Sequence, residues 1–211
     1  LAIRPVLLIC GTALIFGFYP RLASVISLSI FILPLFSRGV YMLNYGAYYG
    51  EALVIFLLGG SYALYEFHKT RRWKIIDAHI AKYKFFILRL IFGGSMVFAA
   101  LYAKFFHANL AIATVEKYGL DKIFHIEPQL FVFGALCVEV MIGLFFIIGF
   151  ELRFTSLFFL AFLIASLFFF KEAVWPHLIL IGTAISVFAH GYDRFTIESR
   201  FVKRKHEEPV F

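Results

Sequence analysis

Long apolar segments separated by short polar breaks run through the whole chain. Because roughly 20 apolar residues are needed to cross the hydrocarbon core of a bilayer, these segments predict membrane-spanning helices. We place seven spans, over residues 2–19, 22–36, 48–67, 85–107, 130–150, 154–170 and 176–191. A competing interpretation joins residues 2–36 into one long helix that is broken at Pro20.

Part of this pattern occurs twice. The stretch GTALIFGFYPRLASVISLSIFILPLF, from Gly11, aligns without gaps with GLFFIIGFELRFTSLFFLAFLIASLF, from Gly143, 132 residues later. Each copy reads as an apolar helix, Gly-Phe, a two-residue break, Arg and a second apolar helix. The identical pairs are Gly11/Gly143, Ile15/Ile147, Gly17/Gly149, Phe18/Phe150, Arg21/Arg153, Ser24/Ser156, Leu28/Leu160, Ile32/Ile164 and Leu35/Leu167. The second break contains no proline, so both copies favour two helices joined by a tight turn.

The repeat predicts the domain organisation. Residues 85–195 hold four of the spans, whereas residues 1–67 hold three that correspond to the second, third and fourth of the same plan. We therefore expect two tandem, parallel four-helix bundles, the first lacking its first helix, which would precede Leu1. A basic linker over residues 68–84 joins them, and residues 196–211 form a tail.

Composition excludes a soluble globular protein. The chain is 62% hydrophobic and only 16% charged, with a mean hydropathy of +0.88, which a soluble core could not hide. The fold class is therefore an all-α integral membrane protein.

Basic residues predict the orientation. They gather in the linker, in the tail and at the two corners, where Arg21 and Arg153 lie. Such a bias places the linker, the corners and the C-terminus in the cytoplasm of a bacterial-type inner membrane, with multiple passes. Attraction to anionic lipid headgroups accounts for the net charge of +7, and nucleic-acid binding is not expected.

The second unit resembles the DoxX family of four-helix membrane proteins. RLIFGGSMVFAALYAKF, VEVMIGLFFIIGFELRFTSLFFLAFLIA and the closing HGYDRF carry the resemblance. The matching positions are Arg89, Gly93, Lys104, Glu139, Gly143, Gly149, Arg153, Gly191 and Asp193. The first unit has Leu7 at the position of Glu139. The resemblance implies a redox-associated membrane subunit with other complex subunits as partners, often without a proven chemistry of its own.

Glu139 is the outstanding candidate residue, because an ionised carboxylate inside an apolar span is expensive unless it is paired or faces a polar cavity. Lys104, near the end of the preceding span, is its natural partner. Two interpretations stay open: a proton or quinone-headgroup site between the helices, and a buried pair that only fixes packing.

Histidines and carboxylates gather in the opposite-side loops. The members are His107, His125, Glu127, Glu172 and His177. Imidazole and carboxylate suit copper, zinc or iron, but no close His spacing is present, so solvated loop residues are favoured over a metal or haem site. Cys10 and Cys137 lie in separate apolar helices without a Cys-x-x-Cys motif, which argues against thiol chemistry.

The leading hypothesis is a non-catalytic, anchoring subunit of a respiratory or other redox complex that lines a quinone or proton path; a haem or metal cofactor is not expected. The alternatives are a small-solute or lipid transporter that uses the groove between the bundles, and a purely structural or assembly protein. The segment YMLNYGAYY, from Tyr41, with Glu51 following, reads as an aromatic interface belt or a contact for a partner.

Overall fold

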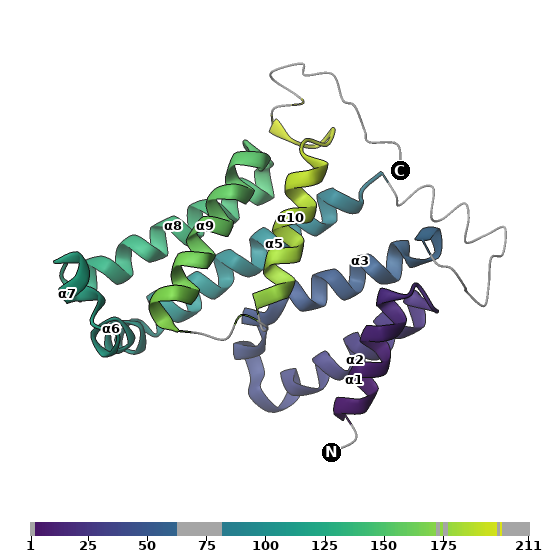
Figure 1. Ribbon diagram of the computed structural model, residues 1–211, viewed down its shortest axis with the longest axis horizontal. Helices are drawn as coiled ribbons and strands as arrows, with labels where there is room; N and C mark the ends of the chain where they lie inside the picture. The colour runs from purple at the N-terminus through teal and green to yellow at the C-terminus, as the bar shows by residue number, and fades with distance from the viewer. Residues whose placement is uncertain (1–2, 63–81, 172–173, 175–176, 198, 200–211) are drawn as a thin grey trace. The chain divides into compact units, whose positions relative to one another are not determined.

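The computed structural model describes residues 3–62, 82–171, 174, 177–197 and 199, and all of the regular structure there is helical (Figure 1). Much of the predicted linker and most of the predicted tail lie outside these residues. The chain divides into two compact units, Leu1–Leu88 and Arg89–Phe211. Unit 1 contains α1 (Ile3–Ile15), α2 (Pro20–Arg38), the 3₁₀-helix η1 (Gly39–Tyr45) and α3 (Gly46–Tyr62).

The remaining helices begin at α5, which starts just before the boundary between the units. They are α5 (Lys84–Ala100), the π-helix η2 (Leu101–Phe106), α6 (Ala108–Lys117), α7 (Leu120–Phe124), α8 (Pro128–Ile148), α9 (Leu152–Phe170) and α10 (Leu178–His190).

The prediction of seven spans is wrong. Among the described residues, four helical segments are long and apolar enough to cross a membrane: Pro20–Leu57, Lys84–Phe106, Pro128–Ile148 and Leu152–Phe170. The first of these segments contains α2, η1 and most of α3, which follow one another in the sequence without a break. The apolar helices α1 and α10 have 13 residues each, which at 1.5 Å per residue is about 20 Å, less than the hydrocarbon thickness.

The two Gly-Phe-x-x-Arg corners have the same backbone conformation. Gly17 and Gly149 have φ values of 68° and 71°, and the residues two positions later, Tyr19 and Glu151, have φ values of 45° and 40°. The amide of the Phe between them bonds back to the preceding helix in both corners, at 2.8 Å to Ala13 and at 3.0 Å to Phe145. Each corner therefore joins two helices by a tight turn, and the single helix broken at Pro20 is wrong.

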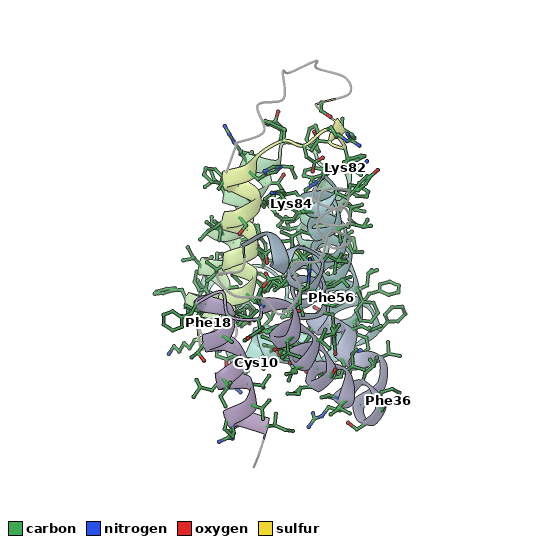
Figure 2. All side chains as sticks on the ribbon, turned by 90° about the vertical axis from the view of Figure 1, so that its right-hand side faces the viewer. Cys10, Phe18, Phe36, Phe56, Lys82 and Lys84 are labelled. Carbon is green, nitrogen blue, oxygen red and sulfur yellow. The ribbon has the colours of Figure 1, made fainter. Side chains whose placement is uncertain are left out.

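Unit 1 is built around the packing of α2 against α1 and α3. Small buried side chains, including Cys10 and Ala23, allow this close approach. Arg21 donates from Nε to the carbonyl oxygen of Phe56 at 3.2 Å, which ties the first turn of α2 to α3. Figure 2 labels Cys10 and Phe56 among the side chains of this unit, and shows Phe36, which is 85% exposed, at its edge.

Unit 2 has a core of three aromatic rings from three helices. Phe92 of α5, Phe146 of α8 and Phe159 of α9 are 1%, 0% and 3% exposed. Their ring centroids lie 5.0, 5.5 and 6.1 Å apart with steep interplanar angles, the edge-to-face geometry that aromatic pairs prefer. We call these three rings the aromatic plug.

Glycines bring α5 and α8 together beside the plug. A Cβ atom added to Gly93 would collide with the carbonyl oxygen of Gly143, and one added to Gly143 would lie 2.7 Å from a methyl group of Val97. The two backbones can therefore cross closely only because neither residue has a side chain.

The connection between η2 and α8 contains helices α6 and α7, where the sequence interpretation placed a long loop. Val115 of α6 and Leu120 of α7 pack with Val132 of α8, and Phe169 and Phe170 of α9 complete this cluster. Charged residues such as Glu116 and Lys117 lie on the exposed side. The helices α6 and α7 are short and amphipathic, so they do not produce the long apolar run that predicts a membrane span.

Candidate functional site: two ion pairs in one helical unit

The α5 helix changes its winding where it approaches Glu139. Residues Leu101–Phe106 form a π-helix, and Lys104 lies within it. Such π-turns are rare and occur frequently at functional sites. The segment ends at His107, whose φ of −122° leaves the helical range. This change in winding could not be predicted from the sequence, because LYAKFF continues the apolar pattern of the helix.

Lys104 and Glu139 form an ion pair. Lys104 Nζ lies 2.7 Å from Glu139 Oε2, and the two side chains are 22% and 20% exposed. Glu139 belongs to the inward-facing stripe of α8, between the buried residues Leu136 and Gly143. The Glu139 side chain therefore projects from the packed face of α8, and the ion pair is only partly exposed.

A partly exposed ion pair has hydrogen-bonding capacity beyond its own contact. The lysine ammonium has three donors, and the carboxylate has two acceptor oxygens. The hydrogen bond between Lys104 and Glu139 uses one of these donors and one of these oxygens. The arrangement can bind a small polar group that offers an acceptor to the ammonium, a donor to the carboxylate, or both.

A second ion pair lies at the other end of the unit, between Arg89 of α5 and Asp193, which follows α10. Arg89 donates from Nε to Oδ2 at 3.1 Å and from Nη2 to Oδ1 at 3.2 Å. Its Nη1 donates to the carbonyl oxygen of Phe146 at 3.0 Å. The side chains are 1% and 9% exposed. Sequence reasoning recorded both residues but missed their contact.

Helix ends from across the unit meet around the Arg89–Asp193 pair. A Cβ atom on Gly149 would collide with Arg89, and Gly149 also contacts Thr196. Tyr192 donates from its hydroxyl to Glu151 Oε2 at 3.0 Å. The start of α5, the α8–α9 corner and the end of α10 therefore lie together at one end of the unit.

The aromatic plug lies between the two pairs. Arg89 and Lys104 are fifteen residues apart on α5 and η2, about 22 Å at 1.5 Å per residue. The three rings are almost fully buried and pack edge to face, so they form an apolar core beside Arg89, whose Nη1 bonds to the Phe146 carbonyl oxygen. The two ion pairs are thus separate sites.

The predicted histidine and carboxylate cluster is not brought together as a metal site. Among the residues that the structure describes, no three His, Cys, Asp or Glu side chains could hold a metal ion. His107 donates from Nδ1 to the carbonyl oxygen of Tyr102 at 2.8 Å. His125 ends α7, Glu127 precedes α8 and His177 precedes α10. Glu172 lies outside the described residues.

The corner arginines differ although their sequence positions correspond. Arg21 is 9% exposed and bonds to Phe56, whereas Arg153 is exposed. Arg153 lies against Gly191, where an added Cβ atom would be 3.0 Å from its Nε. Of the two free cysteines, Cys10 is buried and Cys137 is exposed.

The comparison with protein families matches this part of the chain. The DoxX family model covers residues 85–172. Residues 85–172 are a DoxX domain. The DoxX domain contains both members of the Lys104–Glu139 pair and the arginine of the other pair, while α10 and Asp193 lie beyond the matched residues. No curated protein and no solved structure matches the chain.

Proposed function

We propose that this chain is an accessory, anchoring subunit of a redox complex in the membrane, and that Lys104 and Glu139 bind the headgroup of a quinone. One observation carries the proposal. Lys104 and Glu139 lie in candidate membrane spans and pair with each other, yet each side chain is still about one-fifth exposed. Charges inside a membrane are costly and usually serve a function when they are not sealed in protein.

The chemistry of the pair suits a quinone headgroup that approaches from the lipid. The Lys104 ammonium can donate a hydrogen bond to a quinone carbonyl oxygen. The Glu139 carboxylate can accept the hydroxyl hydrogen of the reduced form. Oxidation of a quinol releases two electrons and two protons. The Glu139 carboxylate can accept one proton and water at the membrane surface the other, but neither side chain can take the electrons. They would pass to a redox centre in a partner subunit, which is why an accessory role is proposed.

The aromatic plug favours a headgroup site over a proton path through the DoxX domain. A proton path needs a chain of polar groups or water, and the three buried rings of Phe92, Phe146 and Phe159 interrupt it. The same argument counts against a solute pathway through this unit. Binding would therefore be confined to the end that holds Lys104.

The test replaces each charge with a neutral side chain of similar shape, Glu139→Gln and Lys104→Met, in the full chain expressed in its native membrane. The measurement is the quinone that copurifies per mole of protein, together with the partner subunits. We expect quinone retention to fall about tenfold, a change of about 1.4 kcal/mol, with partner subunits still bound.

Cys137→Ser is the matched control, because it changes an exposed residue on α8 two positions before Glu139. It should leave the quinone content unchanged. If Glu139→Gln and Lys104→Met also retain wild-type amounts of quinone at normal yield, the headgroup site is wrong.

We also propose that residues 3–62 are an incomplete second copy of the unit formed by α8, α9 and α10. Supporting this, α2 and α9 each have 19 residues and begin at Pro20 and Leu152, 132 positions apart. The helices α3 and α10 begin at Gly46 and Leu178, with the same offset. The shared corner conformation and the glycine pair Gly59/Gly191, each packed against the start of the second helix, agree with it.

Parallel copies place both corners on one side of the membrane, and the basic linker favours the cytoplasmic side. Phe18 and Phe150 are exposed corner residues, so Phe18→Cys and Phe150→Cys can each be probed in a background with both native cysteines replaced. A membrane-impermeant maleimide should label both from the cytoplasmic side. Labelling from opposite sides would contradict parallel copies.

A further inference from the structure

Tyrosines gather at the turn between α2 and α3 in unit 1. Tyr41 and Tyr45 of η1 and Tyr48 of α3 form the tyrosine cluster. Their successive ring centroids are 6.1 and 6.1 Å apart, with interplanar angles of 75° and 62°. Phe31 of α2 supports the cluster at 5.5 Å from Tyr48, and Tyr49 donates from its hydroxyl to the Phe31 carbonyl oxygen at 2.9 Å. The cluster is therefore attached to both neighbouring helices.

A polar group without a partner lies in η1 between two tyrosines of the cluster. Asn44 Oδ1 is buried, and among the described residues no hydrogen-bond donor reaches it. Asn44 is three residues after Tyr41 in a 3₁₀-helix, where residues at this spacing share one face. A buried acceptor that lacks a donor has lost its hydrogen bonds to water without a replacement, which is unfavourable. A bound group that brings an N–H donor would remove this cost.

Charges of both signs flank the cluster. Glu51 is three residues after Tyr48 on α3, so the two side chains share a face of that helix. Arg38 is the exposed last residue of α2, directly before η1. The carboxylate is thus on the α3 side of the cluster and the guanidinium is on the α2 side.

We propose that the tyrosine cluster binds a phospholipid whose headgroup carries a primary ammonium next to its phosphate. The ammonium lies against the tyrosine faces, donates to Asn44 Oδ1 and pairs with Glu51, and the phosphate pairs with Arg38. Aromatic faces attract cations, but a quaternary ammonium has no N–H donor for Asn44. The orphaned acceptor therefore selects the primary amine.

The position of the cluster agrees with a lipid as the source of this headgroup. Tyrosines of membrane proteins concentrate at the level of the lipid headgroups, and Tyr41 and Tyr45 are each 41% exposed. The side chains of these two tyrosines are thus partly open, whereas Asn44 Oδ1 is buried.

The full chain is tested in nanodiscs that contain equal amounts of phosphatidylethanolamine, phosphatidylcholine and phosphatidylglycerol, with retained lipid measured by native mass spectrometry. We expect phosphatidylethanolamine to be enriched about tenfold over each of the others. Glu51→Gln and Asn44→Leu should each reduce the enrichment to less than about threefold. Glu116→Gln, an exposed change on α6, should preserve it.

Four results would overturn the proposal. Equal retention of phosphatidylcholine would show that N–H donation plays no part, and stronger retention of phosphatidylglycerol would show simple attraction to basic residues. Full enrichment in both Glu51→Gln and Asn44→Leu would show that these two side chains do not bind the headgroup. Phosphoethanolamine free in solution should not displace the lipid, because it lacks acyl chains; complete displacement would contradict a lipid as the ligand.

Discussion

The two ion pairs of unit 2 are chemically alike but differ in their access. Arg89 and Asp193 are 1% and 9% exposed, and the arginine also bonds to a backbone carbonyl oxygen. Lys104 and Glu139 are 22% and 20% exposed, and they lie where the helix changes to π winding. The sealed pair joins helix ends that are far apart in the sequence. The partly open pair leaves charge available to another molecule, so the difference separates a structural role from the proposed binding role.

The largest effect is expected at the sealed pair. Asp193→Asn leaves the buried Arg89 guanidinium without its counter-ion, and removing one partner of a buried pair costs about 3–5 kcal/mol. Chemical denaturation of the purified protein in detergent measures this as a lower free energy of unfolding. The double variant Arg89→Met with Asp193→Asn should recover part of the loss, because no unpaired charge remains. A loss below about 1 kcal/mol in the single variant would contradict the sealed-pair account.

A smaller effect is expected at the crossing of α5 and α8, the helices that carry Arg89 and Glu139. Gly93→Ala adds a Cβ atom that collides with the Gly143 carbonyl oxygen, and such overpacking costs about 1–3 kcal/mol. Thermal unfolding measures the change. Gly94→Ala is the control, since a Cβ atom there meets nothing within 4 Å. Equal melting temperatures for the two variants would show that the helices do not cross so closely.

The partly open pair should contribute less to stability than the sealed pair does. Lys104→Met is expected to lower the free energy of unfolding by about 1–2 kcal/mol, between the values typical of exposed and buried pairs. The measurement is the same denaturation series as for Asp193→Asn. A loss as large as that of Asp193→Asn would mean that Lys104 and Glu139 are also mainly structural.

The smallest effect is expected at the edge of the sealed pair. Tyr192→Phe removes the hydroxyl that donates to Glu151, and one partly buried hydrogen bond contributes about 1 kcal/mol. A shift of a few degrees in melting temperature is expected, with no change in copurifying quinone. Loss of quinone in this variant would show that a change near the Arg89–Asp193 pair affects the Lys104–Glu139 pair, and it would weaken the distinction between them.

The sequence predicted the contact between Lys104 and Glu139 because charged residues inside apolar spans are few, so each has few conceivable partners. It missed the pairing of Arg89 with Asp193, which are 104 positions apart. Asp193 lies beyond the last predicted span, where charged residues are ordinary and do not demand a partner, so nothing pointed from Arg89 to it.

Local conformation was predictable where the backbone chemistry is distinctive. Glycine followed by Phe and a two-residue break predicted both tight corners, where Gly17 and Gly149 adopt positive φ values. The π-turn at Leu101–Phe106 and the helices α6 and α7 have no comparable signature. The seven predicted spans were too many because apolar length was counted without knowing where each helix ends, as α1 and α10 show.

The most direct test of the binding role exchanges the two charges, Lys104→Glu with Glu139→Lys, in the full chain in its native membrane. This double variant can still form an ion pair between the same helices, but the ammonium and the carboxylate change places. The measurement is copurifying quinone per mole of protein, with the free energy of unfolding determined on the same sample. We predict that the stability returns to within about 1 kcal/mol of the wild-type value, while quinone retention stays about tenfold lower. Recovery of both quantities would contradict the account, because the ligand would then be insensitive to which residue carries which charge.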